Sequence, residues 1–199
     1  SVGTPVNSLG VLETLIVQIA GLKGTAKVDL GKRAALPFCA DNGVVEEGVS
    51  QSGPEVTSIV AANMARGMSS VCVMGRLSGV VCHPVDVGML YDAEGVLDRK
   101  IARGTNNFTK GPAMSREQAC QALAVGIECV HDLAGQGYGI ILSGEMGIGN
   151  TTTSSALATV LLGKQVEDVT GRGAGLSDTG LACKIDAIKR AIALNEPDP

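Results

Sequence analysis

The fold is decided by the glycine-rich stretch Ser143-Gly144-Glu145-Met146-Gly147-Ile148-Gly149-Asn150-Thr151-Thr152-Thr153. The residues before it, 138–142, form a short apolar run typical of a buried strand, and residues 151–162 have the length and composition of a helix. The glycines between them let the backbone turn sharply or approach a ligand closely. A strand that passes through such a turn into a helix is the building unit of an α/β protein.

The same alternation of strand and helix patterns runs along most of the chain. We predict strands over 33–40, 79–86 and 138–142, and helices over 54–64, 69–77, 115–133, 151–162 and 178–194, with a long irregular segment over 89–114. Ser115 and Gln118 have the spacing of a capping box. Connections of this length indicate a parallel sheet flanked by helices, that is, a Rossmann-like three-layer α/β fold.

The N-terminal part differs from this pattern. Residues 9–22 have a helical period with Ser8 as a possible cap, and a polar, glycine-punctuated stretch follows them. We therefore expect residues 1–30 to be the helical segment of a small subdomain. Residues 31–199 are expected to form an α/β domain.

Composition excludes several classes of protein. The chain has 199 residues, with 16 Lys and Arg against 20 Asp and Glu, so its net charge of −4 disfavours nucleic acid as a partner. Aromatic residues are 2% of the chain, which disfavours a base-stacking platform. Apolar runs such as 156–162 are far shorter than the roughly 20 residues of a membrane span, so no membrane partner is expected.

The cysteines and histidines show no metal-binding spacing. The six cysteines are dispersed without a Cys-x-x-Cys pair, and neither His83 nor His131 has a second ligand nearby in sequence. We predict buried free thiols in a reducing, cytoplasmic compartment, and neither a metal ion nor a cofactor.

The chemistry is expected at the carboxyl ends of the strands, where open α/β sheets bind ligands. Polar loops follow the predicted strands at 41–43, 86–88 and 143–150. In the last of these, glycine backbone and the threonines at the start of a helix favour an anion. The loop is not a Walker A loop, because no Gly-Lys-Ser/Thr follows, and it is not a dinucleotide fingerprint, because Thr152 occupies the place of the third glycine. A single phosphate monoester therefore fits best. The alternative is a glycine-rich connection with an ordinary threonine cap.

Further residues support or weaken this interpretation. Glu145 would repel a phosphate, so we expect it to bind a ribose hydroxyl or a ring N–H; alternatively it faces solvent or the helix dipole. A second cluster, Gly171-Arg172-Gly173-Ala174-Gly175, could add amide donors and a charge, with Lys184 neutralising the same phosphate. The alternatives are a mere turn and a solvated lysine. Ser52 is as well placed to cap the following helix as to contact a ligand.

Together these motifs resemble the nicotinate-nucleotide:dimethylbenzimidazole phosphoribosyltransferase family of cobalamin biosynthesis. The resemblance spans nearly the whole chain and is carried by 8–10, 40–44, 54–57, 86–88, 102–105, 144–152 and 171–173. It implies transfer of the ribose 5-phosphate of nicotinate mononucleotide to 5,6-dimethylbenzimidazole or a related base, giving α-ribazole 5′-phosphate and nicotinate.

The family pattern also implies roles for individual residues. It assigns Gly147, Asn150, Thr151 and Thr152 to the nucleotide, joined by Gly171, Arg172 and Gly173 with Lys184 nearby. Ser52 and Met146 match positions that touch the benzimidazole, and Glu145 matches an active-site carboxylate, here an auxiliary catalytic candidate. The resemblance further implies that residues 31–199 are a nucleotide-binding domain that is incomplete at its C-terminus. The family is dimeric, which implies a homodimer for a full-length protein.

The chain departs from the family pattern in two ways. The glutamate usually assigned as general base lies in a Gly-Glu-Gly type segment beyond Pro199, so we expect this chain to have negligible turnover alone. Val60 stands where relatives commonly have a glutamine near the base pocket, which leaves the preferred base open. The competing hypotheses are a non-catalytic phosphate-ligand binding module, such as one half of a heteromeric enzyme, and a nucleoside phosphorylase.

Overall fold

The computed structural model describes residue 5 and residues 7–198, and the chain divides into two compact units after Gly31. In the first unit the helix α1 (Val11–Lys23) follows Gly10 and has no side-chain cap, so the prediction that Ser8 caps it is wrong. The carboxylate of Glu13 instead accepts the backbone N–H groups of Asn7 and Leu9. None of the residues of α1 is buried.

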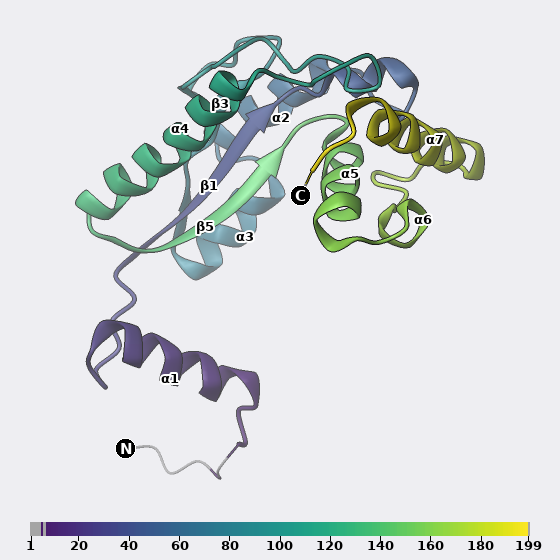
Figure 1. Ribbon diagram of the computed structural model, residues 1–199. Coiled ribbons are helices and arrows are strands. Elements are labelled where there is room, and N and C mark those ends of the chain that lie inside the picture. The colour runs from purple at the N-terminus through teal and green to yellow at the C-terminus, as the bar shows by residue number, and fades with distance from the viewer. Residues whose placement is uncertain (1–4, 6, 199) are drawn as a thin grey trace. The chain divides into compact units, whose positions relative to one another are not determined.

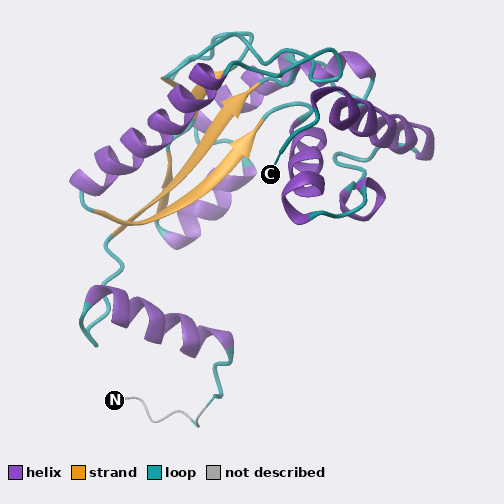
Figure 2. Ribbon diagram, in the orientation of Figure 1, coloured by secondary structure: helices purple, strands orange, loops and turns teal. Residues whose placement is uncertain are grey.

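The second unit is built on a parallel sheet (Figures 1 and 2). Strand β1 (Lys32–Ala40) pairs along its whole length with β5 (Tyr138–Met146). On its other side it pairs first with β2 (Val80–Cys82) and then with β3 (Val85–Gly88), and the two-residue β4 (Leu97–Asp98) lies next to β3. Every pairing is parallel, as the sequence predicted.

Two strands differ from their predicted bounds. The strand expected over 79–86 is divided into β2 and β3, because Pro84 has no N–H to donate to the ladder. Strand β5 runs four residues beyond its predicted end, because residues 36–39 of β1 provide partners as far as Met146. Residues 143–146, expected in the loop, are therefore strand, and the turn itself is only 147–149.

Helices cover both faces of the sheet. Side chains alternate along β1, so Ala34 and Leu36 pack against α4 (Arg116–Gly135), whereas Cys39 packs against α2 (Glu55–Ala65) and α3 (Ser70–Ser78). The predicted capping box at the start of α4 is present in full. The expected three-layer α/β architecture is thus confirmed.

A helical group follows the carboxyl end of β5. It consists of α5 (Asn150–Leu162), α6 (Val166–Val169) and α7 (Asp178–Asn195), which contact one another (Figure 1). The short α6 was not predicted from the sequence. The N-terminus of α7 is capped by Ser177, whose hydroxyl accepts the N–H of Gly180.

All six cysteines are free thiols, but their burial differs. Cys39, Cys72 and Cys129 are buried as expected, whereas Cys120 is exposed on α4, so the prediction of burial is wrong there. Burial, with Asp86 and Asp41 nearby, raises the pKa of Cys39 to about 12, so this thiol is protonated at neutral pH. Within the part of the chain that the structure describes, no helix has both the length and the apolar character that crossing a bilayer requires.

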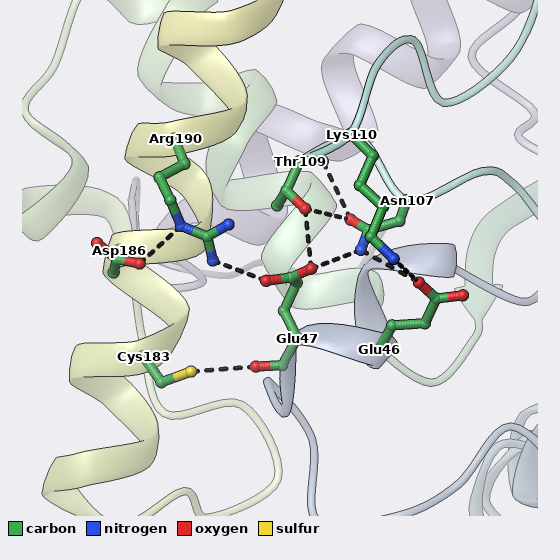
Figure 3. A network of polar contacts seen from close by, with 8 residues as sticks. All are labelled: Glu46, Glu47, Asn107, Thr109, Lys110, Cys183, Asp186 and Arg190. Atoms are coloured by element: carbon green, nitrogen blue, oxygen red, sulfur yellow. Dashed lines mark hydrogen bonds and ion pairs between the residues drawn. The ribbon is translucent and has the colours of Figure 1, made fainter.

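A polar network ties the second unit together around Glu47, at the end of the 3-10 helix η1 (Gly43–Glu47). Figure 3 shows its carboxylate between α7 and the loop before α4. It accepts hydrogen bonds from Arg190 at 2.7 Å, from Asn107 at 2.7 Å and from Thr109 at 2.9 Å. These bonds, led by that of Arg190, lower the pKa of Glu47 from 4.5 to about 2.

This network predicts a pH-dependent contribution to stability. Because the folded-state pKa of Glu47 lies below its ordinary value, its contribution is complete above about pH 4.5 and is lost as the pH falls toward 2. Glu47→Gln should lower the free energy of unfolding by about 1 kcal/mol at pH 7 and by less at pH 3.5. Urea unfolding at both pH values measures this. Glu46→Gln, beside it but paired with the exposed Lys110, should have a smaller effect; equal losses for Glu47→Gln at both pH values would contradict the assignment.

Candidate functional site

A cavity of about 280 Å³ lies at the carboxyl end of β5. Three segments line it: the loop before α2, the turn between β5 and α5, and the loop between α6 and α7. The lining residues are Val49, Ser50, Gln51, Ser52, Met146, Gly147, Ile148, Gly149, Asn150, Thr151, Arg172, Gly173, Ala174 and Leu176. The cavity therefore lies where an open parallel sheet binds its ligands.

The turn between β5 and α5 is held against the end of β1 by close backbone packing. A Cβ atom added to Gly147 would lie 2.0 Å from the carbonyl oxygen of Ala40, so no side chain fits there. Gly149 has φ +87°, a left-handed conformation that other residues rarely adopt. Both glycines are thus required by the path of the backbone.

The opposite wall is tied to the loop before α2. The side-chain amide of Gln51 donates to the carbonyl oxygen of Gly175 at 3.0 Å. The guanidinium of Arg172 donates to the carbonyl oxygen of Leu176 and pairs with Asp178 at the start of α7. The charge of Arg172 is therefore already matched by a carboxylate, while its backbone lines the cavity.

Lys184 provides a charge without a counterion behind this wall. Its side chain is 0% exposed, and its ammonium donates to the hydroxyl of Thr151 at 2.7 Å and to the carbonyl oxygen of Gly171 at 3.1 Å. Among the described residues no carboxylate lies within ion-pair distance of its ammonium. Burial lowers its pKa from the ordinary value of 10.5. A buried cation of this kind is stabilised by an anion that enters beside it.

Backbone donors in the same walls remain available. In residues 7–198 the N–H groups of Gly149 and Gly173 have no hydrogen-bond acceptor. The two glycines lie on the two sides of the cavity, and an ideal Cβ on Gly173 would lie 3.6 Å from the ammonium nitrogen of Lys184. Amide donors next to a buried ammonium are a suitable arrangement for a phosphate group.

The structure brings most of the predicted site residues together. Those that line the cavity are Ser52, Met146, Gly147, Asn150, Thr151, Arg172 and Gly173. Gly171 does not line the cavity, but its carbonyl oxygen accepts a hydrogen bond from Lys184. Thr152 is fully buried behind the turn, and its hydroxyl has no partner among the described residues.

Glu145 lies apart from this group. It pairs in register with Phe38, which packs on the α4 side of the sheet, whereas Met146 packs on the α2 side. Side chains of successive strand residues point to opposite faces, so Glu145 and Met146 diverge. The lining consequently contains no aspartate, glutamate or histidine.

Three alternatives left open by the sequence are wrong. Ser52 does not cap α2, whose N-cap is Pro54 without a side-chain hydrogen bond. No threonine caps α5, because the N-cap is Gly149 in a left-handed conformation. Lys184 is not a solvated surface lysine either.

Sequence reasoning missed the side chains that hold the turn, namely Asp41, Asn42 and Thr57. The sequence placed residues 41–43 in a polar loop at a strand end, and 40–44 and 54–57 among the family motifs, but it gave these three side chains no role because their contacts join distant segments of the chain. No three His, Cys, Asp or Glu side chains in the described residues are grouped so that they could hold a metal ion.

The fold and the cavity define a three-layer α/β protein with a ligand site at the carboxyl end of a parallel sheet. A family model described as phosphoribosyltransferase matches residues 1–199, and the chain belongs to this family, whose curated relatives are named nicotinate-nucleotide–dimethylbenzimidazole phosphoribosyltransferase. The protein of that name from Acetivibrio thermocellus is 46% identical over 200 residues, and that from Escherichia coli is 43% identical over 198.

Solved structures agree with this assignment. The crystal structure of CobT from Thermus thermophilus has a TM-score of 0.91 and 39% identity, and the match covers 98% of this chain and 59% of that one. The matches cover 100% of this chain and 57% of the A. thermocellus protein, and 98% and 55% for E. coli. The chain thus spans a little over half the length of the relatives it matches.

The uncompensated charge of Lys184 gives a two-part prediction. Lys184→Met removes a desolvated cation, so the unfolding temperature without ligand should change little. Inorganic phosphate at 100 times its dissociation constant should stabilise the wild-type chain by about 2.7 kcal/mol, and this gain should disappear in the variant. Thermal unfolding with and without phosphate measures both effects. Lys189→Met, which removes an exposed lysine of the same helix, is the control and should keep the gain. A phosphate response retained by Lys184→Met would show that the anion binds elsewhere.

Proposed function

We propose that this chain is the nucleotide-binding part of a phosphoribosyltransferase. The reaction transfers the ribose 5-phosphate of nicotinate mononucleotide to 5,6-dimethylbenzimidazole or a related base, which yields α-ribazole 5′-phosphate and nicotinate. The single observation that carries the proposal is Lys184, a buried ammonium without a counterion behind an amide-lined cavity. Membership of the family supports the choice of substrates.

The proposal assigns the two walls of the cavity to the phosphoribosyl group. Gly147 and the start of α5, with Asn150, Thr151 and Thr152, bind it from one side. From the other side it is bound by Gly171, Arg172 and Gly173, with Lys184 supplying the charge. Thr152 acts through the position of the helix start, because its own side chain is buried.

The acceptor base is assigned to the side of the cavity with Ser52 and Met146. Met146 packs against the same core cluster as Val60 on α2. Val60 itself is not among the residues that line the cavity, so the preferred base stays open.

The chemistry needs binding energy and one proton acceptor. The pyridinium ring of nicotinate mononucleotide leaves with the electron pair of the bond to C1 and becomes neutral. The unprotonated azole nitrogen attacks C1 from the opposite face and inverts the configuration, and the N–H proton on the other ring nitrogen goes to a base. Phosphate contacts remote from C1 position the ribose for this attack.

The described cavity supplies binding groups but no such base. None of its lining residues is a carboxylate or an imidazole, and Glu145 lies on the other face of β5. We infer that Glu145 is at most an auxiliary group and that the general base comes from polypeptide outside residues 1–199. The chain alone then has negligible turnover.

A second candidate function follows from the same observation. A chain that holds a phosphate ligand and lacks a base fits a non-catalytic binding module or one half of a heteromeric enzyme. The two candidates share the phosphate site and differ in whether additional polypeptide restores turnover.

The proposal extends to assembly and compartment. We infer that α1 belongs to a small subdomain completed by further polypeptide, because it buries none of its own residues. A homodimer of the longer protein and a reducing, cytoplasmic location are proposed with it; the six free thiols support the latter.

A chimera separates the two candidate functions. In it, this chain replaces the matching 57% of the A. thermocellus protein. The chimera should release nicotinate from nicotinate mononucleotide only when dimethylbenzimidazole is present, whereas the 199-residue chain should bind the nucleotide without turnover. Chromatography of nicotinate and of the ribosylated base measures both.

Three outcomes would contradict parts of this proposal. Turnover by the chain alone would show that its own residues include the base. A folded chimera that binds the nucleotide but does not react would favour the binding module. A requirement for free phosphate as co-substrate would favour a phosphorylase.

A further inference from the structure

The peptide groups on both sides of Ile148, in the middle of the turn between β5 and α5, are gripped by side chains from elsewhere in the chain. The N–H of Ile148 donates to the hydroxyl of Thr57 at 3.1 Å, and its carbonyl oxygen accepts from the side-chain amide of Asn42 at 3.1 Å. Thr57 lies on α2 and Asn42 follows β1, so the turn is held by contacts across 91 and 106 residues of sequence.

Asp41 fixes the direction of the Thr57 contact. Asp41 is 2% exposed and Thr57 is 0% exposed, and the Thr57 hydroxyl donates to the Asp41 carboxylate at 2.6 Å. A hydroxyl has one hydrogen, so once it is committed to the carboxylate only lone pairs remain to face the Ile148 N–H. The other carboxylate oxygen of Asp41 accepts the N–H of Leu90 at 2.8 Å, which holds the carboxylate in place.

Asn42 fixes the other peptide group. Its side-chain oxygen accepts the hydroxyl of Thr153 on α5 at 2.9 Å, so its amide nitrogen is directed at the Ile148 carbonyl. That carbonyl and the N–H of Gly149 belong to one trans peptide plane and point in opposite directions. The contact therefore turns the Gly149 N–H away from the Asn42 side-chain amide, and Gly149 lines the cavity whereas Asn42 does not.

We propose that Asp41, Asn42 and Thr57 are positioning residues that hold the two peptide groups of Ile148 and thereby present the Gly149 N–H to the anion. None of the three lines the cavity, so they act through the backbone of the turn. The proposal also assigns unequal roles to neighbouring amides: the Ile148 N–H is occupied by Thr57, and the Gly149 N–H is the donor. It rests on the proposed phosphate site and specifies how that site is built.

The test is a titration of the ¹⁵N-labelled 199-residue chain with inorganic phosphate, followed at the backbone amides. In the wild type, the Gly149 amide signal should move on addition of phosphate, while the Ile148 amide should move little and exchange slowly with solvent deuterium. A fast-exchanging Ile148 amide in the wild type would overturn the proposal without any variant.

Three variants test the clamp, that is, the contacts of Asp41, Asn42 and Thr57 that hold the peptide groups of Ile148. Thr57→Val keeps the shape and removes the hydroxyl, so Ile148 exchange should accelerate and the phosphate dissociation constant should rise about tenfold. Thr57→Ser restores the hydroxyl and should stay within about twofold of the wild type. Asn42→Asp replaces the donor with an acceptor that repels the Ile148 carbonyl, and should weaken phosphate binding at least as much as Thr57→Val.

Thr109→Val is the matched control. Thr109 also donates its hydroxyl to a carboxylate, that of Glu47, but makes no contact with the turn. The Thr109→Val variant should lose some stability, while its phosphate dissociation constant should stay within about twofold of the wild type. If Thr109→Val and Thr57→Val weakened phosphate binding equally, general destabilisation would be the cause, and the proposal would be overturned.

The design separates this proposal from the proposed function. If phosphate moves no amide of the turn in the wild type, the phosphate site itself is refuted. If phosphate binds and Lys184→Met abolishes binding, but folded Thr57→Val and Asn42→Asp bind as the wild type does, only the clamp is refuted. If neither of those variants folds, the wild-type exchange of Ile148 against Gly149 decides.

Discussion

The close packing of Gly147 on the end of β1 is the constraint on which the site depends. With no room for a side chain between Gly147 and the Ala40 carbonyl, the turn after β5 must lie directly against the residues that follow β1. The continuous pairing of β1 with β5 brings the two ends to the same height in the sheet. Asp41, Asn42 and Thr57 can then reach the turn, and α5 starts with its backbone donors beside the cavity. A substitution that moved the turn outward would separate these contacts all at once.

Burying the ammonium of Lys184 costs desolvation free energy, which a bound anion would offset under the proposed function. Burial of Lys184 carries a desolvation cost that no carboxylate offsets. The neighbouring partners of Lys184, a hydroxyl and a carbonyl, accept two of its three ammonium hydrogens without neutralising the charge. Arg172, in contrast, is matched by Asp178. In the proposed function the charge of Lys184 is thus available to the phosphate of the ligand, whereas the charge of Arg172 holds the loop between α6 and α7. The Glu47 network, with its neutral and charged donors, ties α7 to the loop before α4.

Local sequence signals predicted the frame of the protein, and long-range contacts set the details. Ser115 and Gln118 specify the start of α4 within four residues, and the apolar runs identify the strands that form the core. The end of β5 was missed because it depends on partners in β1, and the division of β2 from β3 depends on Pro84 within an otherwise strand-like run. The glycine-rich turn and the 171–175 loop were recognised as a possible anion site from their composition. Three features could be located only once the register of the sheet was known. They are the cavity that the two loops share, the burial of Lys184, and the opposite directions of Glu145 and Met146. The hydrogen bonds of Ile148 with Thr57 and Asn42 join residues about a hundred positions apart, and a single sequence contains no signal for contacts at that distance.

The most direct test of the account is a crystal structure of this chain with nicotinate mononucleotide. We expect the phosphoryl oxygens within about 3.2 Å of the Gly149 and Gly173 amide nitrogens, with the Lys184 ammonium close behind them. The ribose C1 should then face the side of the cavity with Ser52 and Met146. Electron density for the phosphoryl group at another place on the chain, with this cavity holding only water, would contradict the account.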